Sequence, residues 1–240
     1  MTSVLDRPAP GPERTIGYGD APDQVLELWP GGAPGRPLVA LVHGGFWRPA
    51  IDRTHLRPMA TALHVLGWPV ASLEYRRTPG DPEASASDVL AGLRAAGAEA
   101  GPEGVVTVGH SAGGHLVLLA AVRAPDSARA TVALAPVADL GLADRLELGD
   151  GATRAYLGGP ASEHPGLDPA LLPAPTGPVT IVHGDRDDRV PLQVSASYLR
   201  QRPGPRLVGV PRADHFAVVD PWAEAWATVP AEIRRVGGTG

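Results

Sequence analysis

The chain has no cysteine among its 240 residues. This absence excludes a disulfide framework, a thiolate metal site and a cysteine nucleophile. Positive charge is also scarce, since 21 basic residues stand against 26 acidic ones and the formal net charge is -5. No basic cluster stands out that could bind phosphates, so we expect no nucleic-acid partner. The pairs Arg76-Arg77 and Arg234-Arg235 are expected to be solvated.

Long hydrophobic runs are absent as well. Met1 to Gly19 carry proline and glycine where a secretory leader would carry an apolar segment, and no stretch approaches the length of a membrane span. We therefore expect a cytoplasmic protein with no membrane partner. The hydrophobic content of 43% and the charged content of 20% are ordinary for a globular protein.

The most informative feature that is present runs from Val106 to Leu116, where a β-branched strand ends at the turn Gly109-His110-Ser111-Ala112-Gly113 and a helix follows. A Gly-x-Ser-x-Gly turn between a strand and a helix is typical of a nucleophile elbow, which holds the serine hydroxyl clear of the sheet. Ser111 is therefore the candidate nucleophile. The same pattern fits an ordinary helix N-cap, so the partners of the serine must decide.

A serine nucleophile needs a base to take its proton and an acid to orient that base. Two later segments each resemble a buried strand that opens into a polar turn. Residues 180–191 offer three candidate acids, namely Asp185, Asp187 and Asp188. Residues 206–216 end in Asp214-His215-Phe216, and His215 is the predicted general base because it follows the candidate acids in the order Ser, Asp, His.

A second glycine turn supplies candidates for an oxyanion hole. The strand that starts at Leu38 runs into His43-Gly44-Gly45-Phe46-Trp47, where glycine lets the backbone turn its amides inward. The predicted donors are the amides of Gly45, Phe46 and Ala112, with Gly44 as the other possibility. Phe46 and Trp47 directly follow this turn and are the predicted substrate-binding residues, because apolar groups commonly line such pockets.

Taken together, these residues make the chain similar to α/β-hydrolases of the esterase and lipase group. More narrowly, the segments 43–47, 74–76 and 109–116 resemble bacterial serine esterases related to kynurenine formamidase (arylformamidase). The resemblance covers residues 38–226. It implies Asp187 as the acid, because His183-Gly184-x-x-Asp187-x-x-Val190-Pro191 matches the family pattern around that residue, and it also places His215 where the family has its base.

The order of elements predicts an α/β-hydrolase fold with a mostly parallel, doubly wound sheet and helices on both faces. We expect residues 1–22 to be loosely ordered and residues 23–240 to form a single domain, with an antiparallel edge strand at 24–29. The predicted helices are 53–66, 87–100, 192–201 and 222–236, and Pro230 is expected to kink or divide the last one. The predicted strands are 38–42, 68–73, 106–110, 130–134, 180–184 and 206–210.

Between about residues 139 and 175 the alternation fails, and glycine, proline, aspartate and short leucine-bearing pieces replace it. A run of this length without a pattern is more often functional or mobile than packed scaffold. We therefore predict a small cap insertion there that forms part of the substrate pocket.

Four histidines, His43, His110, His115 and His183, suggest a metal cluster if only histidines are considered. Each lies at the end of a strand or beside the elbow, and none has the paired spacing of a zinc-binding helix, so we predict no metal and no cofactor. Glu74 comes before the nucleophile in the chain and is expected to be structural.

The predicted function is hydrolysis of a small carboxylic ester through Ser111, Asp187 and His215 and an acyl-enzyme intermediate, by a monomer or homodimer whose partner is a small acyl substrate. Arylformamidase activity on N-formylkynurenine is the second possibility, because residues 78–82 are shorter than the glycine-rich loop that family often has. A peptidase is the third, since no propeller or large extra domain is present to gate peptides. A non-catalytic ligand receptor on the same fold is the remaining alternative, and the intact set of site residues argues against it.

Overall fold

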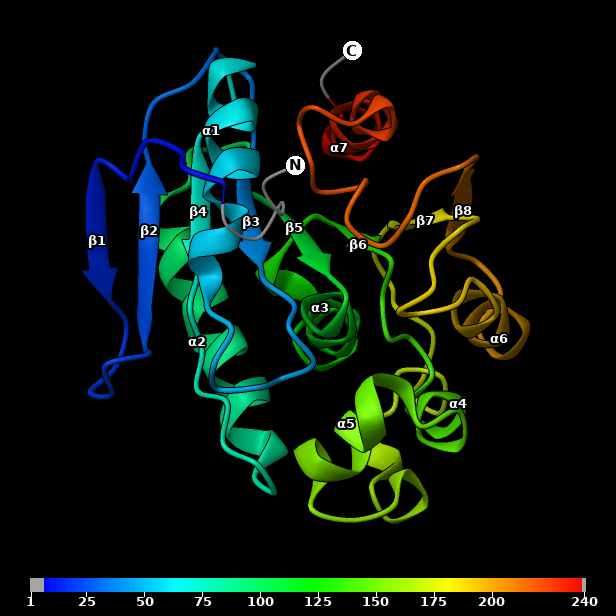
Figure 1. Cartoon of the computed structure of the whole chain (residues 1–240). Helices are drawn as coiled ribbons and strands as arrows, with labels where there is room; N and C mark the ends of the chain where they lie inside the picture. The colour runs from blue at the N-terminus through cyan, green and yellow to red at the C-terminus, as the bar shows by residue number, and fades with distance from the viewer. Residues whose placement is uncertain (1–6, 239–240) are drawn as a thin grey trace.

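The computed structural model describes residues 7–238. Within them, eight strands form one sheet in the order β1-β2-β4-β3-β5-β6-β7-β8 (Figure 1). β1 and β2 pair antiparallel, β2 pairs antiparallel with β4, and the other neighbours are parallel, which confirms the mostly parallel sheet. The strands are β1 (Arg14–Gly17), β2 (Val25–Trp29), β3 (Leu38–Val42), β4 (Val70–Leu73), β5 (Val105–His110), β6 (Ala130–Leu134), β7 (Val179–Gly184) and β8 (Arg206–Val210).

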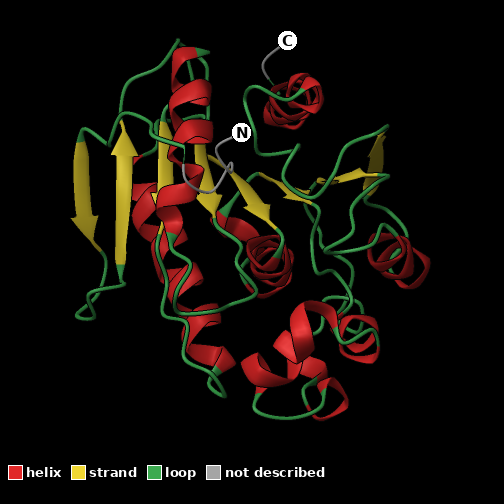
Figure 2. Cartoon of the chain, viewed as in Figure 1, coloured by secondary structure: helices red, strands yellow, loops and turns green. Residues whose placement is uncertain are grey.

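Helices cover both faces of the sheet, as predicted (Figure 2). Each face of the sheet has its own apolar cluster. One cluster contains Leu63 and Ile233, and the other contains Leu93, Leu116 and Val194. The first face carries α1 (Arg57–Val65) and α7 (Thr228–Gly237), and the second carries α2 (Pro82–Glu99), α3 (Ala112–Arg123) and α6 (Gln193–Gln201). Because helices shield both faces, β3 and β5 are buried along their whole length.

The remaining helical segments are short. They are α4 (Leu140–Arg145), α5 (Leu148–Leu157), η2 (Arg53–Leu56), η3 (Pro125–Ser127), η4 (Ala161–Glu163), η5 (Pro165–Leu167) and η6 (Glu224–Ala227).

The N-terminal prediction needs correction. Residues 14–17 form β1, which pairs with β2 from Arg14 opposite Leu28 to Gly17 opposite Val25, so this part of the chain is ordered and β2 is not the edge. β1 is largely exposed and has no apolar alternation, which is why no strand was predicted there. Residues 1–6 of the predicted loose segment lie outside the described residues.

Two helix boundaries also differ from the prediction. α2 begins at Pro82, five positions earlier than expected, because the Asp81 side chain accepts a hydrogen bond from the Ala84 amide and proline suits the first helical turn. Pro230 does not kink a helix, because it lies in the first turn of α7, where its missing N–H has no helical partner to lose. The residues before it form the separate short helix η6.

The segment 139–175 lacks a regular sequence pattern but is packed, and it contains α4, α5, η4 and η5. Asp139 caps α4 by accepting a hydrogen bond from the Leu142 amide at 2.7 Å. The helical period is lost because residues 147 and 149–151 all have positive φ, which turns the chain just before α5 and within its first turn. Leu140, Tyr156 and Leu167 join the core cluster of the second face.

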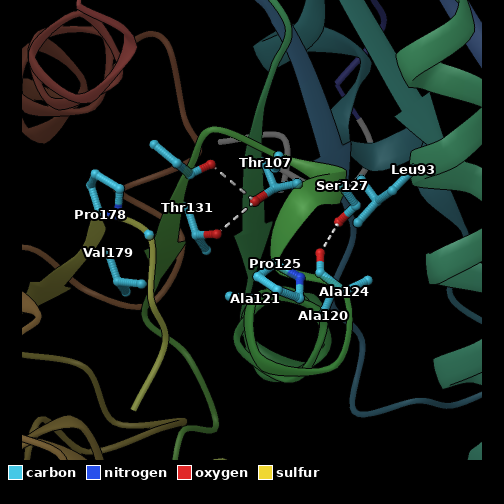
Figure 3. A pocket seen from close by; sticks show the side chains of 13 residues that line it. Leu93, Thr107, Ala120, Ala121, Ala124, Pro125, Ser127, Thr131, Pro178 and Val179 are labelled. Carbon is cyan, nitrogen blue, oxygen red and sulfur yellow. Dashed lines mark hydrogen bonds between the residues drawn. The ribbon is translucent and has the colours of Figure 1, made fainter.

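The amino ends of β5, β6 and β7 enclose a cavity of only about 10 Å³ (Figure 3). The Thr107 hydroxyl lies in its wall and donates to the Thr131 hydroxyl at 2.9 Å. A cavity of this size holds at most about one water molecule, so it is no ligand site. Ser111 lies beyond the opposite end of β5.

A close backbone approach at Gly113 predicts a stability difference between two helical glycines. A Cβ at Gly113 would lie 2.2 Å from the Val42 carbonyl oxygen, whereas a Cβ at Gly97 would meet nothing within 4 Å. We expect Gly113→Ala to lower the free energy of unfolding by about 1–3 kcal/mol through steric overlap. Gly97→Ala, the matched control, should leave it unchanged or raise it by up to about 1 kcal/mol. Urea unfolding measures both, and equal effects would contradict the close approach.

Candidate active site

Ser111 lies between β5 and α3 with φ 55° and ψ -118°, a strained conformation for a residue with a side chain. The two neighbouring glycines make the turn possible. A Cβ at Gly109 would lie 2.3 Å from the Gly113 carbonyl oxygen, and a Cβ at Gly113 would lie 2.2 Å from that of Val42, so both positions require glycine. The elbow geometry expected from the sequence is thus present at Ser111.

The turns after β7 and β8 bring Asp187 and His215 together. His215 Nδ1 donates to Asp187 Oδ2 at 2.7 Å. The other carboxylate oxygen accepts hydrogen bonds from the amides of Arg189 at 2.9 Å and Val190 at 2.8 Å. This arrangement fixes the His215 tautomer and leaves Nε2 as an acceptor. Of the three candidate acids, Asp187 is the one in contact with the histidine.

The Asp187 carboxyl is buried yet ionised. Burial alone would raise its pKa, but hydrogen bonds from His183 and His215 and the charge of His215 outweigh this and hold the pKa well below its usual range. His183 Nε2 lies 3.3 Å from Asp187 Oδ2 and 2.8 Å from the Val190 carbonyl oxygen, so it holds the acid turn in place. A permanent carboxylate at this position can stabilise a protonated His215.

His110 holds the backbone of His215 from below the elbow. His110 Nε2 donates to the His215 carbonyl oxygen at 2.9 Å, and the centroids of the two rings lie 4.6 Å apart. Burial and the neighbouring His215 charge lower the pKa of His110 well below its usual value, so this ring is neutral. No local pattern predicts this contact, because 105 residues separate the two histidines.

Ser111 and His215 line one pocket of about 280 Å³, together with Gly45, Phe46 and Ile51. The Ser111 hydroxyl has no hydrogen-bond partner among residues 7–238. A contact between nucleophile and base is often long in an unliganded site and tightens when substrate binds. The pocket also contains Arg48, Arg189, His55 and Phe216, which the sequence analysis did not single out.

The glycine turn after β3 runs directly beside the elbow. A Cβ at Gly44 would lie 2.9 Å from the Ser111 Cβ, and Gly45, Phe46 and Trp47 all have positive φ. The amides of Gly45 and Phe46 have no acceptor within the described part of the chain. Ala112 is the first residue of α3, where an amide has no partner inside the helix. These three amides are free to bind an anionic oxygen.

Trp47, which the sequence predicts to bind substrate, does not line this pocket. Its side chain is 3% exposed and stacks on Tyr156 with ring centroids 4.4 Å apart. The positive φ of Trp47 turns the chain so that its side chain enters the core. Phe46, by contrast, lines the pocket as predicted.

A buried charged cluster supports the glycine turn from behind. Glu74 is 2% exposed, and its carboxylate contacts His43 Nε2 at 2.9 Å, the Arg53 guanidinium at 3.1 Å and Arg77. Arg77 is itself buried, so the expectation that Arg76-Arg77 is solvated is wrong for that residue. His43 Nδ1 lies 2.8 Å from the Gly44 carbonyl oxygen, which connects the cluster to the turn. Burial and the charge of Arg77 lower the pKa of His43 to about 3.

The four histidines considered as metal ligands have other partners. His115 Nε2 donates to the Leu167 carbonyl oxygen at 2.8 Å, and the Ser195 hydroxyl lies 2.8 Å from His183 Nδ1. Within the described residues, no group of three or more His, Asp or Glu side chains is arranged to hold a metal ion. In the same residues, no helix is both long enough and apolar enough to cross a membrane.

The sequence matches a family model and a relative among known proteins. Residues 78–217 match the model of the prolyl oligopeptidase family. Esterase LipQ of Mycobacterium tuberculosis is 30% identical over 226 residues, an alignment that covers 79% of this chain and 54% of that protein. The chain therefore spans about half the length of this relative.

Two solved structures share the fold. An acetyl ester-xyloside bifunctional hydrolase from Caldicellulosiruptor lactoaceticus has a TM-score of 0.77 and 18% identity, with 96% of this chain and 98% of that chain covered. A thermophilic esterase from Thermogutta terrifontis with propionate bound has a TM-score of 0.70 and 23% identity, with 94% and 93% covered. The α/β-hydrolase fold expected from the sequence is confirmed.

The low pKa of Asp187 predicts a pH dependence of stability. An unfolded aspartate titrates near pH 4, so the stability from the ionised Asp187 is fully present above that value and is lost as the pH falls toward its lower folded pKa. We expect the free energy of unfolding of wild type to exceed that of Asp187→Asn by on the order of 2 kcal/mol above about pH 4. Below that pH the difference should shrink. Urea unfolding at several pH values measures the gap. Asp188→Asn removes one charge at the exposed neighbour and is the matched control. A difference between wild type and Asp187→Asn that stays constant with pH would contradict the prediction.

Proposed function

The chain belongs to the prolyl oligopeptidase family of α/β-hydrolases, and on this basis we propose that it is a serine hydrolase that cleaves small carboxylic esters. One observation carries the proposal. A histidine hydrogen-bonded to a buried carboxylate at 2.7 Å lines the same pocket as a serine on a strained elbow. This combination is the arrangement that activates a serine hydroxyl toward a carbonyl carbon.

In the proposed mechanism, His215 Nε2 takes the proton of the Ser111 hydroxyl as Oγ attacks the ester carbonyl. The oxyanion that forms accepts hydrogen bonds from the amides of Gly45, Phe46 and Ala112. The protonated His215, stabilised by Asp187, then gives its proton to the leaving alcohol, and an acyl-enzyme remains. In the second half-reaction His215 takes a proton from water as the water oxygen attacks the acyl carbonyl, and it then gives that proton to Ser111 Oγ as the acyl bond breaks and the carboxylic acid is released.

A short acyl group suits the size and walls of the pocket. A volume of about 280 Å³ lies at the lower end of small-molecule sites, and the apolar part of its wall comes from Phe46, Ile51 and Phe216. The mycobacterial relative is named as an esterase, which supports an ester as the substrate class. Hydrolysis of N-formylkynurenine would use the same residues, so this formamide belongs in the first substrate panel.

Removal of the nucleophile or base tests the proposal directly. We expect Ser111→Ala and His215→Ala to lower kcat/KM on 4-nitrophenyl butyrate by about 10⁴-fold or more, with the fold intact by circular dichroism. Esters of longer acyl chains and N-formylkynurenine are assayed in parallel to define the preference. Full ester turnover by Ser111→Ala would exclude Ser111 as the nucleophile.

The oxyanion turn gives a second test. Gly45 has φ 107°, and a Cβ there would lie 2.5 Å from the Ile51 Cβ, so Gly45→Ala must displace the turn. We expect a loss of about a hundredfold in kcat, the size associated with loss of one oxyanion donor. Gly31→Ala is the matched control, because Gly31 also has a positive φ of 78° but an added Cβ would meet nothing within 4 Å. An equal loss of kcat in the control would count against a specific role of the turn.

A further inference from the structure

The pocket that holds Ser111 is positively charged. Its lining residues include Arg48 and Arg189 but no Asp or Glu, although the chain has a formal net charge of -5. Burial lowers the pKa of His55 to about 4 and that of His110 well below its usual value, so these two lining side chains are neutral at pH 7. The two guanidinium groups are therefore the permanently charged side chains in the pocket lining, and the Asp187 carboxylate lies behind His215.

Arg189 is fixed at its backbone and free at its side chain. Its amide donates to Asp187 Oδ1 at 2.9 Å, which sets its position relative to the acid. Its guanidinium forms neither an ion pair nor a hydrogen bond with any group in residues 7–238. The neighbouring Asp188 is exposed and does not line the pocket. An unneutralised cation thus stands beside the reacting groups.

Arg48 is held by the first turn of α5. Its guanidinium donates to the Gly149 carbonyl oxygen at 2.5 Å and lies 5.9 Å from the centre of the Phe46 ring. The nearest carboxylate, on the exposed Asp150, is 4.0 Å away and is not part of the pocket lining. This carboxylate is solvated, so it screens the charge of Arg48 only weakly.

We propose that this pocket selects esters that carry a carboxylate close to the scissile bond, with Arg189 as the main specificity-determining residue and Arg48 as the second. A pocket lined by charge of one sign raises the local concentration of ligands of the opposite sign. A guanidinium pairs with a carboxylate through two parallel hydrogen bonds. The inference rests on the proposed ester hydrolysis for its chemistry, and it adds the charge of the substrate.

Two pairs of substrates test this selection, each a carboxylate and its carboxamide of nearly equal shape. Monoethyl succinate and ethyl succinamate place the group on the acyl side, whereas butyryl glycolate and butyryl glycolamide place it on the alcohol side. In at least one pair we expect wild type to have a higher kcat/KM for the carboxylate than for the carboxamide, measured as release of acid. The pair that shows this preference identifies whether the carboxylate binds on the acyl or the alcohol side of the ester. Arg189→Gln should reduce that preference about fivefold, and added salt should weaken it in wild type.

Arg186→Gln is the matched control, because Arg186 is exposed in the same turn but does not line the pocket. It should retain the wild-type preference, whereas an equal loss in Arg186→Gln and Arg189→Gln would overturn the role of Arg189. Equal or faster cleavage of the carboxamide in both pairs would overturn the selection itself.

Turnover of neutral 4-nitrophenyl butyrate tests the proposed function separately. If folded wild type fails to hydrolyse it, binding of the same two pairs is followed by ligand-observed NMR. Tighter binding of the carboxylates would then support the inference without the hydrolase, and equal binding would overturn it.

Discussion

The backbone of α3 passes the end of β3 at a distance that leaves no space for a side chain. A Cβ at Gly113 would lie 2.2 Å from the Val42 carbonyl oxygen and 2.4 Å from that of His43. This contact brings the elbow and the glycine turn together, so that Ser111, Gly45 and Phe46 line one pocket. The geometry of the site therefore depends first on two backbones in contact, and the side chains that carry the chemistry are added to that frame.

The charged cluster behind the glycine turn has a positional role that its energy alone does not explain. Removing Glu74 and Arg77 from water carries a desolvation cost, and a well-packed apolar pair of equal volume would often be at least as stable. The cluster nevertheless joins β4, η2 and the end of β3 through Glu74, Arg53 and His43. Its hydrogen bonds are directional, and His43 transmits them to the turn by contacting both Glu74 and the Gly44 carbonyl oxygen.

The sequence predicted the parts of the molecule whose pattern is local. The parallel strands, the elbow at Ser111 and the position of β8 before His215 follow from β-branched runs and glycine turns that are visible in a few residues. The choice of Asp187 needed the resemblance, because three acids share one turn and only contact with His215 distinguishes them. β1, the inward orientation of Trp47 and the burial of Arg77 were missed. β1 is largely exposed and has no apolar pattern, whereas Trp47 stacks on the distant Tyr156 and Arg77 contacts the distant His43.

The segment between β6 and β7 is tied to the site by three separate contacts. Tyr156 stacks on Trp47, the Gly149 carbonyl accepts from Arg48, and the Leu167 carbonyl accepts from His115 of α3. The segment therefore cannot be exchanged as an independent module between related proteins without remodelling the oxyanion turn as well. Among related proteins, sequence changes in this insertion should therefore accompany sequence changes in residues 46–48. A change in substrate range would then require both segments to change together.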